Sequence, residues 1–177
     1  MIMSNIIKYD NIEFEKYIDN IQIVERSKEI SDNINADYIN EEFVFIGVLN
    51  GCIPFMNLLL SNISNIYSYN FIKISSYSGT KAGDIDFELG ISKKDIFNKN
   101  IVIIEDIVDS GKSIKFITNY INQYGPKTLK VVSLLVKKES IGLCDWYGFK
   151  ISDKFVIGFG MDIDGSFRDL KDIYIKV

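Results

Sequence analysis

The sequence predicts an α/β fold in which helices cover a parallel sheet. Apolar runs of strand length recur along the chain at 43–49, 101–104 and 129–136. Segments whose apolar residues have helical spacing lie between them, and strands that alternate with helices form parallel sheets. At 177 residues, of which 47% are hydrophobic and 25% charged, the chain is long enough for one domain with a substantial core.

Each element is predicted from its own local pattern. Ile23, Ser27, Ile30 and Ile34 share one helical face, and Pro54 is acceptable in the first turn of a helix. Glycine and proline mark turns between the elements. In chain order we expect a helix that ends near 35–37, a strand at 43–49, a helix from Pro54, and strands at 71–75, 101–104, 129–136 and 155–159.

Residues 101–113, IVIIEDIVDSGKS, are the most informative segment. Four apolar, mostly β-branched residues are typical of a central strand buried on both faces. The turn that follows leads into apolar residues at helical spacing, so it opens a helix whose free N–H groups suit a phosphate. Glycine permits close approach of the anion. The site would hold a sugar phosphate through Ser110, Gly111, Lys112 and Ser113.

Glu105 and Asp106 are adjacent on this strand, so their side chains are expected to point to opposite sides of it. Sugar hydroxyls that bridge the two carboxylates fit this arrangement, as does a magnesium ion held by few carboxylates and by substrate oxygens. The alternative is that both are solvated acids that precede a helix. A nucleoside-triphosphatase motif is rejected, because Asp106 stands where that motif requires a glycine.

Composition excludes several classes of function. A net charge of −4 and a pI near 4.9 give no general attraction to nucleic acid or to anionic membrane. The chain has no histidine, which removes serine-histidine and cysteine-histidine catalysis and most zinc sites. Cys52 and Cys144 have no metal-ligand spacing and are expected to be reduced packing residues. With no export signal and no long apolar run, a cytoplasmic protein is expected.

Residues 105–113 resemble the phosphoribosyl pyrophosphate signature of type I phosphoribosyltransferases, specifically of their hypoxanthine-guanine branch. The resemblance covers nearly the whole chain. The family pattern is also matched by Ser76 and Tyr77, LLVK at 134–137, DKFVIG at 153–158, Asp162 and FRDL at 167–170. It implies a type I phosphoribosyltransferase fold, with a central, mostly parallel twisted sheet flanked by helices. It also implies one domain over 1–177, with a mobile active-site loop at about 76–97 and a small hood at about 140–177.

The resemblance implies a reaction of purine salvage. The 5-phosphoribosyl group of phosphoribosyl pyrophosphate passes to hypoxanthine or guanine, giving IMP or GMP and pyrophosphate, with Mg²⁺ required. Asp109 is implied as the general acid/base that faces N7 of the purine. Residues 109–113 would hold the 5′-phosphate, while Glu105 and Asp106 would bind the ribose hydroxyls and a magnesium ion. The family also implies a homodimer or a homotetramer.

Five further residues are implied to contact the base. Lys137 would donate to the exocyclic oxygen, a contact that the amino group of adenine cannot accept. Phe155 would stack on the base, with Ile107 on its other face and the backbone of Val156 at the ring edge. Asp162 would lie near the base edge and a second magnesium ion. Taken singly, Phe155 and Ile107 are explained as well by core packing.

Pyrophosphate is implied to bind at Asn50, Gly51 and Arg168. The guanidinium of Arg168 has a planar fork of donors that suits pyrophosphate. Ser76 and Tyr77 would close over the reacting carbon and exclude water. The alternative for Arg168 is a surface ion pair with a neighbouring acid. The alternative for Ser76 and Tyr77 is a plain exposed loop. Asn50 stands where the family usually has lysine or arginine, so weaker pyrophosphate binding or altered rates are expected.

Two other functions stay open. The first keeps the reaction but changes the base to xanthine, adenine or a pyrimidine. The second is a non-catalytic regulator of the same fold that binds nucleotides or RNA. The acidic charge balance and the presence of Asp109 argue against a regulator.

Overall fold

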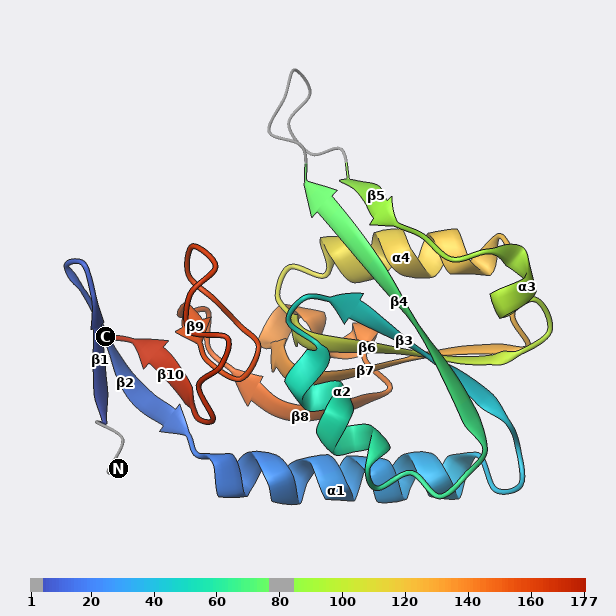
Figure 1. The fold of residues 1–177 in the computed structure, drawn as a ribbon, viewed down its shortest axis with the longest axis horizontal. Coiled ribbons are helices and arrows are strands. Elements are labelled where there is room, and N and C mark those ends of the chain that lie inside the picture. Colours follow the sequence, from blue (N-terminus) through green and yellow to red (C-terminus); the bar gives the residue numbers. More distant parts are fainter. Residues whose placement is uncertain (1–4, 77–84) are drawn as a thin grey trace.

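The structure is a computed structural model that describes residues 5–76 and 85–177. These residues form a six-stranded sheet flanked by helices and a separate four-stranded sheet beside it (Figure 1). In chain order the elements are β1 (Ile6–Tyr9), β2 (Ile12–Ile18), α1 (Asn20–Asp37), β3 (Phe43–Leu49), α2 (Ile53–Leu60), β4 (Tyr67–Ser76), β5 (Ile85–Leu89), α3 (Lys93–Ile96), β6 (Asn100–Val108), α4 (Lys112–Asn122), β7 (Thr128–Lys137), the 3₁₀ helix η1 (Lys138–Leu143), β8 (Trp146–Ile151), β9 (Val156–Ile157) and β10 (Ile173–Lys176).

The large sheet has the strand order β5-β4-β3-β6-β7-β8, and only β5 runs antiparallel to its neighbour. The predicted α/β class with a mostly parallel sheet is therefore confirmed. β6 pairs with β3 only as far as Ile104, opposite Gly47, whereas it pairs with β7 as far as Val108. The last residues of β6 thus extend beyond β3, and the segment after β3 has room to turn toward them.

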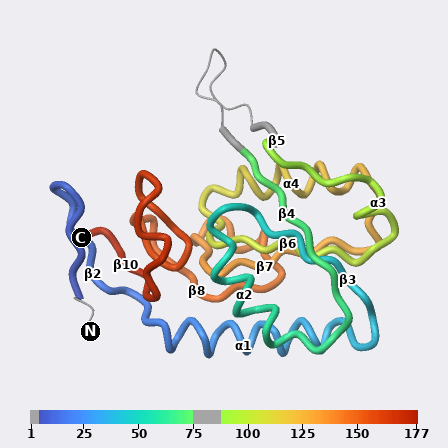
Figure 2. Tube along the Cα trace, in the orientation of Figure 1, coloured from blue at the N-terminus to red at the C-terminus, as the bar shows by residue number. Residues whose placement is uncertain are grey.

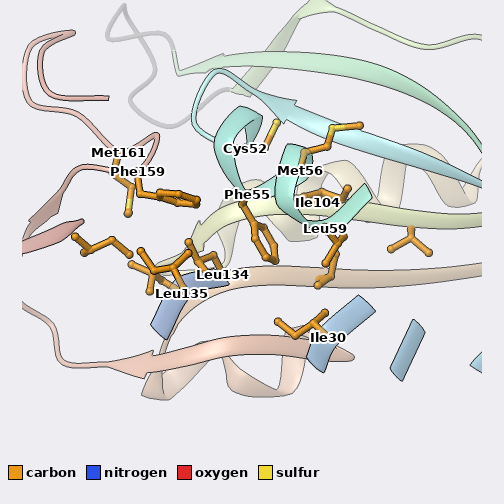
Figure 3. Packing of buried hydrophobic residues seen from close by; sticks show 14 of the residues in the cluster. Ile30, Cys52, Phe55, Met56, Leu59, Ile104, Leu134, Leu135, Phe159 and Met161 are labelled. Carbon is orange, nitrogen blue, oxygen red and sulfur yellow. The ribbon is translucent and has the colours of Figure 1, made fainter. Parts of the chain in front are cut away.

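Helices cover both faces of the large sheet (Figure 1). α1 and α2 bury one face, where Ile30, Phe55 and Leu59 pack against Ile104 and Leu134 (Figure 3). α4 covers the opposite face with its apolar stripe, which packs on the other side chains of β6. Complete burial of both faces is the reason that 101–104 is an unbroken apolar run.

The first helix is confirmed, since α1 buries Ile23, Ser27, Ile30 and Ile34. The hydroxyl of Ser27 donates to the carbonyl of Ile23 at 2.7 Å, which satisfies a polar group inside the core. Asp19 begins the helix with a capping box that includes Gln22. In the described ranges, no helix is both long enough and apolar enough to cross a membrane.

The strand expected at 155–159 is correct only for β9, Val156–Ile157, which belongs to the small sheet. Gly158, Phe159 and Gly160 all have positive φ values, so the chain leaves extended geometry directly after Ile157. The strand expected at 71–75 begins earlier, at Tyr67. The sequence did not reveal β1, β2, β8 or β10.

The small sheet has the order β1-β2-β10-β9, and all its pairs are antiparallel. Its strands β9 and β10 lie within the range of about 140–177 where a hood is expected. β8 from that range joins the large sheet instead, and β1 and β2 complete the small one (Figure 2). Phe14, Ile157 and Tyr174 form its buried centre.

The segment expected as an active-site loop, about 76–97, includes regular structure. Ile85–Leu89 forms β5, which pairs with β4, and Lys93–Ile96 forms the short α3. Ser76 is the last residue of β4. Tyr77 lies outside the described residues, so its expected role in loop closure stays a prediction.

Candidate active site

The turn between β6 and α4 is built as a tight, anchored loop. Gly111 caps α4 with a φ of 73°, in the left-handed region that glycine favours. A Cβ added there would lie 2.2 Å from Cδ1 of Leu143, so space as well as backbone conformation requires glycine. The hydroxyl of Ser140 donates to the carbonyl of Asp109 from the other side. Asp109, Ser110 and Lys112 remain exposed around the start of α4.

Glu105 and Asp106 lie at the end of β6 and interact directly with each other. Glu105 is only 7% exposed. Burial raises its pKa well above the ordinary value, and the nearby charge of Asp106 and a hydrogen bond between the two side chains add to this effect. Burial also raises the pKa of Asp106, although its carboxylate accepts a hydrogen bond from the Ile107 N–H at 2.9 Å.

β6 keeps a regular parallel register with β7 across these two residues, with Glu105 opposite Ser133 and Ile107 opposite Leu135. Ile104 and Ile107 both pack in the core beneath α1 and α2, although they are three residues apart. The expectation that the carboxyl groups of Glu105 and Asp106 point to opposite sides of the strand stays a prediction. Two neighbouring carboxyl groups can bind the same ligand from this geometry.

The loop after β3 turns back onto Asp106. Asn50 is exposed and follows a cis peptide bond, and Gly51 is buried. A Cβ added to Gly51 would lie 1.7 Å from Oδ2 of Asp106. A Cβ added to Gly160 would lie 2.0 Å from the carbonyl oxygen of Gly51. Three separate segments therefore meet here at backbone distance, and only glycine fits at the two contact points.

The third segment, residues 158–168, is held in place by the core and by an ion pair. Phe159 and Met161 point into the large apolar cluster near Leu134 and Leu135 (Figure 3). Arg168 Nη2 lies 2.6 Å from Asp162 Oδ1, and its Nη1 donates to the carbonyl of Gly160 at 2.7 Å. The ion-pair partner of Arg168 is thus Asp162, on the same loop, and Asp162 lines the same cavity as Asp106.

A cavity of about 180 Å³ opens beside these segments. Lys137 is mostly buried, and its Nζ lies 2.9 Å from Asp109 Oδ1 and 3.2 Å from the carbonyl of Asp153. Phe155 is 48% exposed, so core packing does not account for it. The cavity brings together all five predicted base contacts and is lined by Asp106, Ile107, Asp109, Lys137, Lys154, Phe155, Val156, Met161 and Asp162.

Sequence reasoning did not assign Lys154 or Met161 to the site. Lys154 stands within the DKFVIG segment and could have been included from that motif alone. Met161 had no local signal, because it reaches the cavity only through the glycine-rich turn at 158–160.

Two larger hollows, of about 500 and 880 Å³, lie at the opposite end of the sheet around Glu41, Glu42 and Ile66. Another, of about 440 Å³, lies between α4 and β7. Some of the polar groups of the first two hollows bind one another. Asn100 Nδ2 donates to Glu41 Oε2 at 2.7 Å, and Lys127 Nζ pairs with the same oxygen at 2.6 Å. Ligand sites of open α/β sheets lie at the carboxyl ends of the strands. The smaller cavity, at that end, is therefore the candidate site.

The described residues argue against thiol chemistry. Burial raises the pKa of both Cys52 and Cys144 to about 12, so neither thiol is an activated nucleophile at neutral pH. Among residues 5–76 and 85–177, no three acidic, cysteine or histidine side chains are grouped to hold a metal ion by themselves.

Comparison with known proteins agrees with this arrangement. Residues 14–164 match the family model described as the phosphoribosyl transferase domain. This chain belongs to the phosphoribosyl transferase family. Among curated members, the hypoxanthine-guanine phosphoribosyltransferase of Mycoplasma genitalium is 33% identical over 156 residues, which are 84% of this chain and 87% of that protein.

Solved structures of phosphoribosyl transferases show the same fold. A hypoxanthine-guanine phosphoribosyltransferase from Bacillus anthracis superimposes with a TM-score of 0.85 at 34% identity, over 94% of this chain and all of that one. The hypoxanthine phosphoribosyltransferase of Trypanosoma cruzi, in complex with its product IMP, has a TM-score of 0.83 at 29% identity, over 96% of each chain. The predicted type I phosphoribosyltransferase fold is confirmed.

Proposed function

We propose that this chain transfers the 5-phosphoribosyl group of phosphoribosyl pyrophosphate to a 6-oxopurine, hypoxanthine or guanine, and releases IMP or GMP and pyrophosphate. The observation that carries this proposal is the pairing of Lys137 with Asp109 at 2.9 Å in the cavity. In a 6-oxopurine, O6 and N7 are neighbours on one edge of the ring. A lysine and a carboxylate side by side are complementary to that edge when N7 carries a proton.

This edge also explains the choice of base. The ammonium group of Lys137 has only donors, which suit O6. Adenine presents an amino group at the same position, so two donors would face each other. In this proposal, Asp109 holds or removes the proton at N7 as the base forms its new bond through N9. Phe155 and Ile107 line the same cavity and suit the two faces of a planar ring.

The phosphoribosyl group fits the adjacent surface. Exposed Ser110 and Lys112 and half-buried Ser113 surround the start of α4, where the first N–H groups of a helix have no partner within it. A 5′-phosphate at this point places the ribose hydroxyls toward Glu105 and Asp106. The pyrophosphate group would bind beyond Asp106, at Asn50, Gly51 and Arg168.

We propose that Mg²⁺ binds with the substrate at Glu105 and Asp106. The described residues provide no complete set of protein ligands, which fits an ion that keeps oxygens of the substrate or water. Asp162 is a weaker candidate, because its two oxygens already accept from Arg168 and from the Gly165 N–H. When bound, magnesium neutralises charge on the pyrophosphate leaving group.

The proposal extends to the setting of the enzyme. Cys52 and Cys144 are both free, which suits the reducing cytoplasm. Ile53 on α2 and Tyr69 on β4 are exposed apolar side chains, and they suit the subunit contact of a homodimer or homotetramer.

Turnover of hypoxanthine, guanine, xanthine and adenine with phosphoribosyl pyrophosphate, measured with and without Mg²⁺, tests the proposal. We expect turnover of 6-oxopurines and none of adenine. The Asp109→Asn variant should bind phosphoribosyl pyrophosphate normally but react at least 100-fold more slowly, the usual order for loss of an acid/base group. Binding without turnover of any purine would favour a pyrimidine substrate or a regulator.

A further inference from the structure

The hairpin of β1 and β2 contacts the loop that carries Arg168 and Asp162. The ring of Tyr9, the last residue of β1, meets the ring of Phe167 edge to face, with 5.5 Å between centroids and 88° between planes. The Tyr9 hydroxyl donates to Asp164 Oδ2 at 3.4 Å. Because 155 positions separate Tyr9 from Asp164, this contact joins two distant parts of the chain.

Phe167 has an unusual backbone conformation. Its φ is 74°, in the left-handed region, which a bulky aromatic residue rarely adopts. Such a conformation persists only when its surroundings enforce it. Tyr9, Ile163 and Leu170 pack with Phe167 against the buried centre of the small sheet. The ring of Phe167 is therefore held by the small sheet while its backbone belongs to the active-site loop.

The conformation of Phe167 fixes the position of Arg168, the next residue. The Gly160 N–H donates to the Arg168 carbonyl at 2.9 Å, and the Arg168 guanidinium donates to the Gly160 carbonyl at 2.7 Å. The same guanidinium pairs with Asp162 at 2.6 Å. If Phe167 relaxed to a negative φ, the peptide before Arg168 would rotate and both contacts would change.

We infer that Tyr9 and Phe167 are positioning residues, through which the β1–β2 hairpin directs Arg168 and Asp162 toward the bound substrate. This inference rests on the proposed function, in which Arg168 binds pyrophosphate. It gives the hairpin a role in substrate affinity in addition to its role in the small sheet. The ring contact is the main element, since the hydroxyl contact is long and exposed.

The test compares Tyr9→Ala, Tyr9→Phe and Tyr17→Ala. Tyr17 is an exposed tyrosine of β2 and serves as the matched control. For Tyr9→Ala we expect the KM for phosphoribosyl pyrophosphate and the Kd for pyrophosphate to rise about tenfold, with a much smaller change in kcat. Tyr9→Phe should restore both constants to within about twofold, because it keeps the ring. Tyr17→Ala should leave them unchanged.

A double-mutant cycle with Arg168→Ala separates positioning from general loss of structure. If Tyr9 acts through Arg168, Tyr9→Ala should have little further effect on either constant once Arg168 is alanine. A full additional effect in that background, or an unchanged pyrophosphate Kd in folded Tyr9→Ala, would overturn the inference. The pyrophosphate Kd, measured by calorimetry, tests the positioning role of Tyr9 even if the wild type turns over no base. Absence of turnover in the wild type would refute the proposed function but not this inference.

Discussion

Oδ2 of Asp106 lies directly against the Cα of Gly51, where the segment after β3 meets the end of β6. A methyl group at Gly51 would be 1.7 Å from that oxygen, so Gly51→Ala must displace either the loop or the carboxylate. We expect a loss of about 1–3 kcal/mol in the free energy of unfolding, as for other overpacked sites. Because Asp106 is proposed to bind the ribose and magnesium, kcat/KM should fall more than this loss of stability explains.

Gly142→Ala is the matched control, because a Cβ added at Gly142 meets no atom within 4 Å. Chemical denaturation and steady-state kinetics of the two variants provide the comparison. Equal stability and activity of Gly51→Ala and wild type would show that the loop yields freely, contrary to this account of the site.

Glu105 is expected to oppose stability while it supports activity. Its burial beside Asp106 raises its pKa, so the folded state holds this proton more tightly than the unfolded chain. The free energy of unfolding therefore falls as pH rises from the ordinary carboxyl range toward the raised value. Glu105→Gln removes this loss and should stabilise the protein at neutral pH by about 1 kcal/mol, on the order of the cost of a buried polar group.

The advantage of Glu105→Gln should shrink at acidic pH, where Glu105 is protonated in the wild type too. Its kcat/KM should fall, because the neutral amide is a poorer ligand for magnesium. Urea denaturation across the pH range tests the first statement, with exposed Glu139→Gln as control. A variant less stable than wild type at neutral pH would contradict the expected effect of burial.

Asn50 is the position where a cation should improve binding. Asn50 is exposed on the loop next to Gly51, so Asn50→Lys can place an ammonium group near the proposed pyrophosphate site without burying it. We expect pyrophosphate binding to tighten by roughly 0.5–1 kcal/mol, the usual worth of an exposed charge pair. Calorimetry at low and high salt should show the gain shrinking as salt rises. The control is Asn57→Lys, on the exposed face of α2, which adds the same charge farther along the chain than Asn50→Lys.

Lys137 is expected to determine the preference for 6-oxopurines. Lys137→Met keeps the length of the side chain but removes the donor that the exocyclic oxygen needs. We expect kcat/KM for hypoxanthine to fall about 10- to 100-fold, in line with a hydrogen bond to a charged group, and discrimination against adenine to decrease. The control is Lys138→Met, at the exposed neighbouring position. Unchanged selectivity in Lys137→Met would remove Lys137 from the recognition of the base.

The sequence was sufficient to predict the elements whose pattern is strong and local. β6, its turn and α4 follow from an apolar run, a glycine and helical spacing. β2 and β8 were missed, although Ile12, Phe14 and Ile18 of β2 alternate in part with polar residues. Short strands of this kind become recognisable only once their partners are known, because pairing across the chain stabilises them more than local propensity does.

The composition of the site was more predictable than its contacts. Lys137, Asp109 and Asp162 were all expected near the substrate, but their ion pairs were not. The Asp162–Arg168 pair lies in a segment with positive φ values at Phe159 and Phe167, which residue propensities do not predict. The apolar pattern of 101–104 likewise gave no reason to expect that burial beside Asp106 raises the pKa of Glu105.

In the small sheet, Ile173 of β10 pairs with Ile18 of β2. During synthesis, β1 and β2 therefore leave the ribosome long before the strand that completes their sheet. Loop closure over so large a separation is slow and unfavourable until the chain between is ordered. The large sheet is expected to form first and to bring the two ends together. A nascent chain that stops before β10 would contain the phosphate turn but would lack the support for Arg168, so catalytic competence would be among the last properties to appear.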